Sequence, residues 1–432
     1  MSARSTASGT SIHASVDMRV AVIGAGAAGC LCAAEIKRRL PEAEVTVFEG
    51  GAKPLAKVAI TGGGRCNFTN SFENIDRLEE AYPRGARLMK RALMRFGPED
   101  ARRWFENEGV PSVVMEDGCV FPASQDAMDI VRALERAMRL AGVKVICRHR
   151  VTSLENIDGI FRIAFSGSSL PCFEADKVVL TTGGSPTAGG LSMLAPLGLE
   201  TIAPVPSLFT FNIGDESLKS LMGAVVNNAL VGLAGSSFRA RGALLLTDWG
   251  VSGPAILKLS SYAARDLADK GYRGTLNISW LGTARETECM ELLQEMASES
   301  PRKQVVSTCP AALTGRLWRH IAARAGLRED LRWAETGSRG MARLASILAC
   351  DAYPITGRCR FKDEFVTCGG VSLSEVSLNT LESKKHPGLH FAGEVLDVDA
   401  ITGGFNLQAA WSMAYTVADA ISSCSGDGDG AC

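Results

Sequence analysis

The chain opens with apolar runs that alternate with a helical pattern. Residues 18–23 form a short apolar run that ends at a glycine, which predicts a buried parallel strand. Residues 27–40 have the spacing of a helix and stop at Pro41, and residues 44–48 form a second apolar run. This order predicts a strand–helix–strand unit whose two strands run parallel.

More elements of the same kind follow before residue 195. A Gly-rich loop covers residues 57–70. Helices are expected at 98–108 and 125–141, strands at 143–151 and 177–181, and a small hairpin at 160–165 with 172–173. These elements continue the α/β pattern of the first unit.

The pattern changes after Ala195, where prolines at 196, 204 and 206 mark a crossing into a different region. Strand-like runs follow at 208–213, 224–233, 243–247 and 275–280, and helical spacing follows at 286–297, 311–325 and 340–352. Tyr353-Pro354 ends this region. Strands at 364–367 and 389–391 and a long helix at 404–421 then return to the first pattern.

We therefore expect an α/β fold with a Rossmann-like nucleotide-binding domain in two chain segments. An inserted β-rich domain and a small helical subdomain separate the two segments. The expected boundaries are 18–194 for the first segment, 195–283 for the β-rich insert, 284–354 for its helical part and 355–423 for the second segment.

Composition narrows the class of protein. The 432 residues are 46% hydrophobic and 22% charged, which is typical of folded soluble proteins. The net charge of −1 gives no global attraction to nucleic acid or to an anionic membrane, so we expect neither as a partner, although a local basic patch is compatible with it. Thirteen scattered cysteines without a Cys-x-x-Cys pair indicate reduced thiols in a cytoplasmic protein. Residues 1–17 lack the apolar stretch of a secretory signal, and we expect a disordered extension there.

The first turn carries a dinucleotide-binding fingerprint. Residues 20–29 read VAVIGAGAAG. In this pattern Gly24 makes the tight turn, Gly26 lets the backbone approach a pyrophosphate, and Gly29 lets helix and strand pack closely.

The following helix and the second strand extend this fingerprint. The helix begins at Ala27 and Ala28, where free N–H groups suit phosphates. Glu49 follows the second strand, where an acid accepts hydrogen bonds from a ribose 2′-OH. Strand, motif, helix, strand and acid occur in order, which favours dinucleotide binding over a Gly-rich turn without function. The fingerprint alone does not separate FAD from NAD.

Three further segments favour FAD, and the first is the glycine loop. Gly62, Gly63 and Gly64 allow backbone to lie against a flat ring system with no side chain between. Asn67 and Asn70 can donate hydrogen bonds to ring or ribityl atoms. A plain surface turn is the alternative.

Two residues of this loop are candidates for chemistry. Cys66 is either a thiol that acts beside the flavin or a small wall residue, and we favour the wall because no partner cysteine is visible. Arg65 suits a substrate carboxylate or the cofactor pyrophosphate, and we favour the cofactor. Four other side chains are conceivable proton donors, although each is expected to be structural: Tyr353, His386, His390 and Tyr415.

The second segment follows the strand at 177–181, and the third covers residues 391–408. In the third, Glu394 could hold ribityl hydroxyls, and Gly403 and Gly404 open a helix whose positive end would stabilise charge on a reduced flavin. We expect cofactor contacts from the following residues of these two segments: Thr182, Gly183, Gly184, Gly393, Glu394, Gly403, Gly404, Asn406 and Leu407.

These segments closely resemble the BaiN-like (YhiN-like) flavoprotein family, which belongs to the two-dinucleotide-binding-domain flavoproteins. The matching stretches are residues 24–29, 62–70, 250–254 and 393–408. The resemblance implies an FAD-binding domain in two chain segments around an insert, and it makes Val151 the strand residue whose backbone meets the adenine. One departure from the family pattern is a shortened loop at 185–190.

The resemblance also implies an activity. The family reduces an enone-type C=C bond of a small organic substrate with FAD, and NAD(P)H is the electron donor. Because no second complete fingerprint is present, we expect NAD(P)H to bind transiently at the flavin. Two alternatives stay open: an FAD-dependent amine oxidase that uses oxygen, and a flavin-binding sensor without turnover. The sequence shows no metal-binding pattern.

Overall fold

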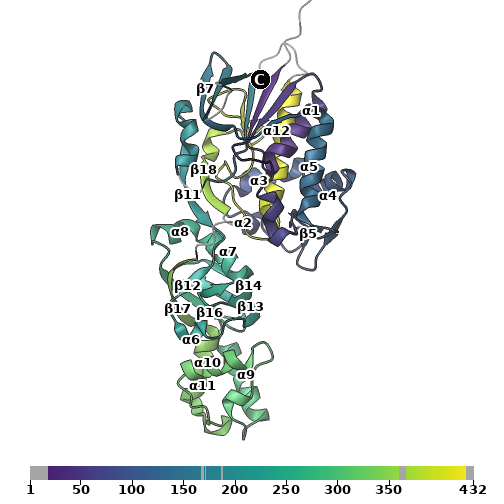
Figure 1. Cartoon of the computed structure of the whole chain (residues 1–432). Helices are drawn as coiled ribbons and strands as arrows, with labels where there is room; N and C mark the ends of the chain where they lie inside the picture. The colour runs from purple at the N-terminus through teal and green to yellow at the C-terminus, as the bar shows by residue number, and fades with distance from the viewer. Residues whose placement is uncertain (1–17, 167–169, 171, 186–187, 360–365, 425–432) are drawn as a thin grey trace, which may run out of the picture.

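The computed structural model describes residues 18–166, 170, 172–185, 188–359 and 366–424. They form an elongated molecule with two halves, one above the other in Figure 1. We call the described residues of 18–207 and 366–424 the Rossmann half, and residues 208–359 the barrel half. Each half has its own hydrophobic core.

A five-stranded parallel sheet forms the centre of the Rossmann half, in the order β19-β10-β1-β2-β6. Its strands are β1 (Arg19–Ile23), β2 (Glu44–Phe48), β6 (Lys144–Ile146), β10 (Lys177–Leu180) and β19 (Leu389–Phe391). The central strands are buried almost throughout, as expected for a parallel sheet that is covered on both faces. Since β19 pairs with β10, the last chain segment completes the sheet that the first one begins.

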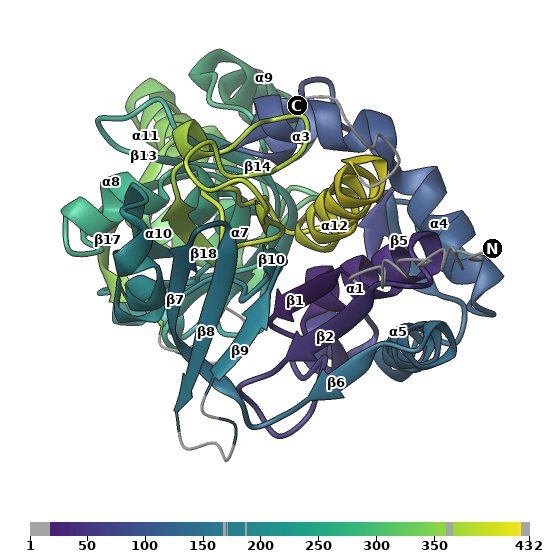
Figure 2. The ribbon, with the colours of Figure 1, turned by 90° about the horizontal axis from the view of Figure 1, so that it is seen from above.

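Helices cover one face of this sheet, and a small antiparallel sheet covers the other. On the first face α1 (Ala27–Arg39) packs between α5 (Ala127–Ala141) and α12 (Phe405–Cys424), as Figure 2 shows. On the second face lie β7 (Arg150–Ile157), β8 (Ile160–Ser166) and β9 (Cys172–Ala175). Phe48 of β2 contacts the rings of Phe165 and Phe173 there, with centroids 4.8 and 5.0 Å apart.

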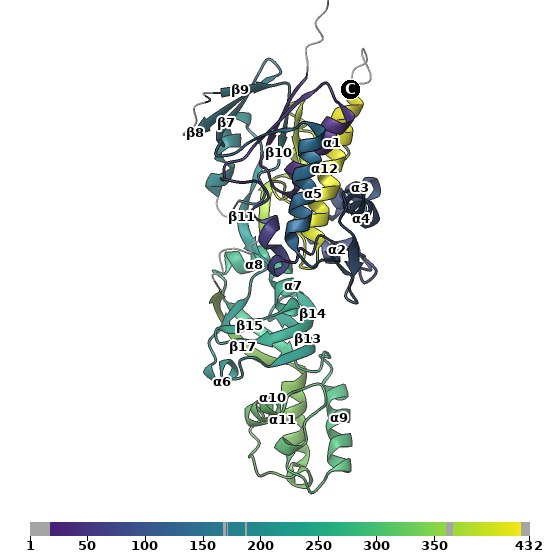
Figure 3. The same ribbon diagram turned by 45° about the vertical axis from the view of Figure 1, so that its right-hand side comes forward.

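Shorter elements complete the Rossmann half. They are η1 (Val58–Gly64), β3 (Thr69–Asn70), α2 (Leu78–Ala81), α3 (Ala86–Arg95), α4 (Pro98–Asn107), β4 (Ser112–Val114), β5 (Cys119–Pro122), η2 (Ala188–Leu197) and η5 (Leu373–Glu375). Two further strands, β11 (Thr201–Ser207) and β18 (Val366–Val371), pair antiparallel and connect the two halves (both labelled in Figure 1, β11 also in Figure 3).

The barrel half begins with a closed barrel in the order β12-β15-β14-β13-β16-β17. Its strands are β12 (Phe211–Ile213), β13 (Val225–Leu233), β14 (Arg239–Leu246), β15 (Gly250–Ser252), β16 (Gly274–Ser279) and β17 (Asp351–Arg358). The helices and 3₁₀ segments of this half are α6 (Glu216–Lys219), α7 (Pro254–Tyr262), α8 (Ala264–Asp269), α9 (Glu286–Glu299), η3 (Val305–Ser307), α10 (Gly315–Arg324), η4 (Trp333–Glu335) and α11 (Gly337–Ala349).

A buried carboxylate ties the barrel to the helices below it. Asp351 of β17 is fully buried and accepts hydrogen bonds from Trp280 Nε1 at 3.0 Å and from the Tyr353 hydroxyl at 2.7 Å. Arg324 of α10 forms an ion pair with it at 2.6 Å. The charge of Asp351 is therefore paired and its lone pairs are used, which is the condition for burying a carboxylate.

The expected α/β class, with a Rossmann-type parallel sheet and a separate β-rich region, is confirmed. Two local expectations differ from the structure. Residues 143–151 form parts of two strands in different sheets, β6 and β7, because Arg148 between them has φ +60° and turns the chain. β17 continues past Pro354, where we expected the insert to end, because this strand closes the barrel. The domain boundaries themselves stay predictions.

Candidate cofactor site

The glycine fingerprint forms a tight turn between β1 and α1. Gly24 has φ +105°, a conformation that favours glycine, and its N–H donates to the Phe48 carbonyl of β2 at 2.8 Å. A Cβ on Gly24 would lie 2.5 Å from the carbonyl oxygen of Thr181, and one on Gly29 would lie 2.0 Å from the carbonyl oxygen of Gly24. Both positions therefore have room only for glycine.

The first turn of α1 leaves its backbone N–H groups open. Gly26 is the N-cap residue, and it supplies no side-chain cap. A Cβ on Gly26 would meet nothing within 4 Å, so the space beside it is open. Ala27 and Ala28 begin the helix there, and no acidic side chain lies in its first turn. Open N–H groups together with the helix dipole make this end suitable for phosphate groups.

Glu49 is held at the end of β2 beside this turn. Its Oε2 accepts a hydrogen bond from the Ala25 N–H at 2.9 Å, and its Oε1 accepts one from the Gly51 N–H at 2.6 Å. Each carboxylate oxygen keeps a further lone pair, which suits a sugar hydroxyl. The acid of the fingerprint is therefore fixed in orientation next to the glycine turn.

The glycine loop has backbone conformations that favour glycine. Gly62, Gly63 and Gly64 have φ values of +59°, +66° and +82°. A Cβ on Gly63 or on Gly64 would meet no atom within 4 Å. This part of the loop therefore presents bare backbone to open space, as close approach of a flat ring requires.

The two candidate residues for chemistry in this loop differ in exposure. Cys66 is fully buried, and burial raises the pKa of its thiol to about 12. Such a thiol stays protonated near neutral pH, which favours a wall residue over a nucleophile. Arg65 is exposed, and its guanidinium lies over the ring of Phe121 at 4.6 Å. The cofactor contact expected from Arg65 stays a prediction.

Three segments that are far apart in the sequence meet at this site. A Cβ on Gly404 would lie 2.6 Å from Oδ1 of Asn67, so the start of α12 lies against the glycine loop. Gly393 lies beside α1, since a Cβ there would be 3.3 Å from the Cβ of Ala28. The fingerprint, the glycine loop and the C-terminal segment thus surround one location, as a long cofactor with two ends requires.

Glu394 connects the C-terminal segment to the turn that follows β10 and to β18. Its Oε2 accepts a hydrogen bond from the Gly184 N–H at 3.2 Å, and its Oε1 accepts one from the Thr367 N–H at 3.0 Å. Burial raises the pKa of this carboxyl, while the charge of Lys57 and the two backbone bonds oppose that shift. Glu394 therefore orders the turn after β10, and its expected contact with ribityl hydroxyls stays a prediction.

Two asparagines that we expected to contact the cofactor bond to the protein itself. The side chain of Asn70 is buried, and its Nδ2 donates to the Gly403 carbonyl at 2.9 Å. Asn406 accepts a hydrogen bond from the Ala400 N–H at 2.9 Å and donates to the Ala400 carbonyl at 3.1 Å. Both side chains hold the backbone of the C-terminal segment in place, so cofactor contacts through them stay predictions.

The other expected contacts lie around the same part of the Rossmann half. Val151 is half-buried in β7, Thr182 is exposed after β10, Gly183 has φ +73°, and Leu407 is half-buried in α12. Their contacts with a cofactor also stay predictions. Residues 186–187 of the shortened loop lie outside the described residues.

The conceivable proton donors have structural roles. Tyr353 lies in the barrel half, and His386 bonds through Nε2 to a backbone carbonyl at 2.8 Å. Tyr415 stacks on a phenylalanine at 4.6 Å between centroids, and His390 is buried in β19. None of these contacts belongs to the turn, loop or helix start described above.

Two side chains near the glycine loop were missed in the sequence. Cys119 of β5 lies beside Asn67, and although the Asn67 side chain opposes the shift, burial raises the pKa of the Cys119 thiol to about 11. The charge of Lys258, from α7 of the barrel half, acts on the same thiol. Neither residue stands in a motif: pairing of β3 with β5 brings Cys119 beside the loop, and Lys258 comes from the barrel half.

The donor set fits a dinucleotide cofactor. The open helix end suits a pyrophosphate, the fixed acid suits a ribose, and the bare glycine loop suits a ring system. In the part of the chain that the structure describes, no cluster of His, Cys, Asp or Glu is arranged to hold a metal ion. Among the described helices, none combines the length and the apolar character that crossing a membrane would need.

Comparisons with known proteins show the family of the chain. A family model described as the HI0933-like protein Rossmann domain matches residues 18–420. A ribosomal RNA dihydrouridine synthase of Escherichia coli (strain K12) is 30% identical over 409 residues, which cover 92% of this chain and 96% of that protein. A 3-dehydro-bile acid delta(4,6)-reductase of Clostridium scindens is 27% identical over 410 residues, which cover 92% and 97%.

Solved structures share the fold at lower identity. A 3-ketosteroid-delta4-(5alpha)-dehydrogenase from Rhodococcus jostii RHA1 has a TM-score of 0.50 and 15% identity, covering 96% of this chain and 99% of that one. The resemblance to the BaiN-like family is confirmed, and so is the expected enzyme class. The chain therefore belongs to the HI0933-like Rossmann-domain family, and it is an FAD-dependent oxidoreductase.

Proposed function

We propose that this protein reduces a C=C bond that is conjugated to a carbonyl group, with NAD(P)H as the electron donor. The observation that carries the proposal is the shared chemistry of its relatives, which match over more than nine-tenths of both chains. A dihydrouridine synthase saturates the 5,6 bond of uracil, which is conjugated to a ring carbonyl. A delta(4,6)-reductase of a 3-dehydro-bile acid saturates bonds conjugated to the 3-oxo group. Two substrates of different shape thus call for the same hydride addition.

The residues of the chain support this reaction by holding and shielding the cofactor. When bound, FAD supplies hydride transfer to an electron-poor carbon. The open N–H groups of α1 would hold its pyrophosphate, and Glu49 would hold its ribose. The start of α12, at Gly404 beside Asn67, would place the positive end of a helix dipole near the ring system. Such an end favours the negative charge that reduction brings.

The overall reaction takes a hydride and a proton. NAD(P)H loses the hydride and becomes NAD(P)⁺, and the C=C bond gains one hydrogen at each carbon, the second as a proton. Because the chain has one complete fingerprint, the nicotinamide is expected to bind only while it transfers its hydride. The acceptor of the hydride is either a small molecule or a uracil base of an RNA.

Anaerobic rapid mixing tests this function. The FAD-loaded protein is mixed with NADPH, with NADH and with small primary amines, and bleaching of the flavin absorbance is followed. Bleaching by a nicotinamide should be followed by reoxidation when a uridine-containing ribosomal RNA fragment or a 4,6-dien-3-one steroid is added. Mass spectrometry should then show the saturated product, and free FAD without protein is the control. Bleaching by amines alone, with hydrogen peroxide release in air, would overturn the proposal in favour of an amine oxidase.

A further inference from the structure

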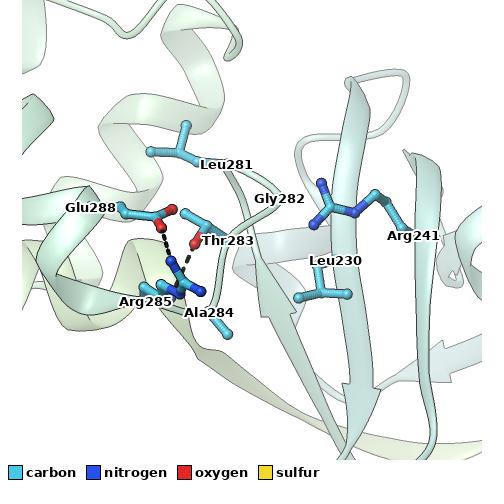
Figure 4. A pocket seen from close by; sticks show the side chains of 8 residues that line it. All are labelled: Leu230, Arg241, Leu281, Gly282, Thr283, Ala284, Arg285 and Glu288. Atoms are coloured by element: carbon cyan, nitrogen blue, oxygen red, sulfur yellow. Dashed lines mark hydrogen bonds and ion pairs between the residues drawn. The ribbon is translucent and has the colours of Figure 1, made fainter.

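Basic side chains line a groove where the barrel half faces α2 of the Rossmann half. One cavity of about 440 Å³ has four basic residues and two acidic residues in its wall: Arg77, Arg239, Arg241, Lys258, Glu79 and Glu80. A second cavity of about 500 Å³ shares Arg241 and continues along the loop before α9. Figure 4 shows Arg241 extending from its strand toward Gly282 of that loop. We call the two cavities together the β14 groove.

Three cations in the β14 groove have no acidic partner. Within the described residues, the side chains of Arg241 and Lys258 form no ion pair and no hydrogen bond. Arg239 donates to backbone carbonyls of the turn before β14, at 2.7 and 3.0 Å, which orients its guanidinium without neutralising it. Arg77, by contrast, is paired with Glu80 at 3.1 Å. The positive charge of the groove therefore comes from the side contributed by the barrel half.

The strand geometry places two of these charges in a row. Arg239 and Arg241 are two positions apart on β14, so they share one face and their Cα atoms are about 7 Å apart. Both side chains are exposed, whereas Ala240 and Leu244 point into the barrel core. A row of guanidinium groups on a strand suits a ligand with repeated anionic groups better than one with a single anion.

Lys258 connects this row to the cofactor site. It lines the β14 groove, and its charge also acts on Cys119 of β5. Cys119 lies beside Asn67 of the glycine loop, which in turn lies against Gly404. Among the cations of the groove, Lys258 is therefore the one whose charge reaches the strand beside the glycine loop.

We propose that the β14 groove binds the phosphate backbone of a single-stranded RNA segment while one of its uracils reaches the flavin. This inference rests on the proposed function, because it names the acceptor that the groove would present for reduction. A free steroid or nucleobase has no repeated anionic charge and would leave the arginine row unused. An RNA strand supplies one phosphate per nucleotide, and its unpaired bases can turn away from the backbone.

The net charge of the chain does not oppose this binding. We expected no nucleic-acid partner because the sum of charges is −1. That sum concerns only long-range attraction, whereas phosphate contacts depend on local clusters of arginine and lysine. Folding brings Arg241 and Lys258 together from positions that no basic run in the sequence marks.

Binding of a labelled oligonucleotide tests the groove independently of turnover. The probe is a fluorescein-labelled, uridine-rich single-stranded RNA of about 12 nucleotides, within the range of single-strand binding sites. The FAD-loaded full chain is titrated against it by fluorescence anisotropy between about 50 and 200 mM salt, where phosphate contacts show their dependence. Arg241→Glu should raise the Kd for RNA about tenfold or more. It should also reduce the slope of log Kd against log salt concentration by about 0.7–1.

Three variants make this test specific. Arg241→Lys keeps the charge and should keep most of the affinity, and Lys258→Gln should weaken binding less than Arg241→Glu because it removes one charge without adding an opposite one. Arg339→Glu makes the same charge change on exposed α11, outside the groove, and should alter Kd by less than about twofold. An equal effect of Arg241→Glu and Arg339→Glu would overturn the inference. Tighter Arg241-dependent binding of poly-glutamate than of RNA would overturn it as well, in favour of an acidic protein.

The two proposals can fail separately. RNA binding that depends on Arg241, without formation of dihydrouridine on the oligonucleotide, would support the groove and count against the proposed reaction on RNA. Formation of dihydrouridine with an unchanged Kd in Arg241→Glu would support the reaction and count against the groove.

Discussion

The centre of the barrel half and the cofactor site of the Rossmann half differ in whether their polar groups find partners within the protein. At the centre of the barrel half, Asp351 receives hydrogen bonds from two side chains and pairs with Arg324, so its polar atoms are used within the protein. At the cofactor site of the Rossmann half, the first turn of α1 and the glycine loop leave backbone groups facing open space. The comparison teaches that the Asp351 network is complete by itself, whereas the cofactor site of the Rossmann half leaves backbone groups that its own side chains do not bind.

Removing the buried carboxylate should have the largest effect. Asp351→Ala leaves the Tyr353 hydroxyl and Trp280 Nε1 without their acceptor and Arg324 without its partner. We expect the free energy of unfolding to fall by about 3–5 kcal/mol, as measured by urea denaturation followed by circular dichroism. Asp330→Ala is the control, because its carboxylate is exposed and its ion pair with Arg328 is long at 3.6 Å. A loss below about 1 kcal/mol would show that the barrel does not depend on this network.

Two glycines of the fingerprint should separate folding from cofactor binding. Gly29→Ala puts a Cβ 2.0 Å from the Gly24 carbonyl, so we expect loss of FAD together with about 1–3 kcal/mol of stability in the cofactor-free protein. Gly26→Ala meets no protein atom, so stability of the cofactor-free protein should change by less than about 0.5 kcal/mol while FAD affinity falls. Flavin absorbance per protein and thermal unfolding measure the two quantities. Equal FAD content in Gly26→Ala and wild type would contradict the placement of the pyrophosphate.

The ion pair that joins the C-terminal segment to the loop between α2 and α3 should matter less. Arg84 binds Asp399 through both Nε and Nη2 and donates to the Ser261 carbonyl at 2.7 Å. Arg84→Lys keeps the charge but loses the two-pronged geometry, so we expect a loss of about 1–2 kcal/mol. The matched change Arg95→Lys, at an exposed pair with Asp419, should cost less than about 0.5 kcal/mol. Similar losses in the two variants would mean that the buried position of Asp399 confers no advantage.

Acid should destabilise the Rossmann half through one buried histidine. Burial lowers the pKa of His390 below its ordinary value, and Glu382 only partly offsets this. Above pH about 6.5 both folded and unfolded chains keep the ring neutral, whereas below it the unfolded chain takes up a proton that the folded chain refuses. The contribution of neutral His390 to the free energy of unfolding is thus complete above pH about 6.5 and is lost as the pH falls. This loss is at most about 1 kcal/mol between pH 6.5 and 5.5.

Chemical denaturation at several pH values measures this slope. His390→Gln should reduce it more than His320→Gln, because His320 of the barrel half is only half-buried and its downward pKa shift is opposed by Asp351 and Asp215. A larger effect of His320→Gln would reverse the comparison between the halves.

Much of the Rossmann half could be predicted from local patterns. The apolar run before Gly24 and the helix after Gly26 are read from neighbouring residues, and the structure has β1 and α1 at those positions. The meeting of the glycine loop with Gly404 was predicted from the need of one cofactor for both segments, and the geometry agrees. The local sequence pattern was sufficient here because glycine is favoured where the backbone has a positive φ or where another part of the chain approaches closely.

Side-chain roles could not be predicted in the same way. Asn70 and Asn406 look like free donors in the sequence, but their partners are backbone groups that only the folded chain brings near, one of them 333 residues away. The strand expected at 143–151 is two strands, since alternation of apolar residues does not reveal a turn at Arg148 with φ +60°. The β14 groove was missed because β14, α7 and the residue before α2 each contribute only one or two of its cations.

The pairing of β11 with β18 determines how the barrel half is inserted into the Rossmann half. Both crossings between the halves run next to each other, with Ser207 directly opposite Val366. A short reverse turn that joined Ser207 directly to Val366 would close the Rossmann half and leave out the entire barrel half. The barrel half therefore enters and leaves the chain at one place on the Rossmann half, without interrupting the parallel sheet.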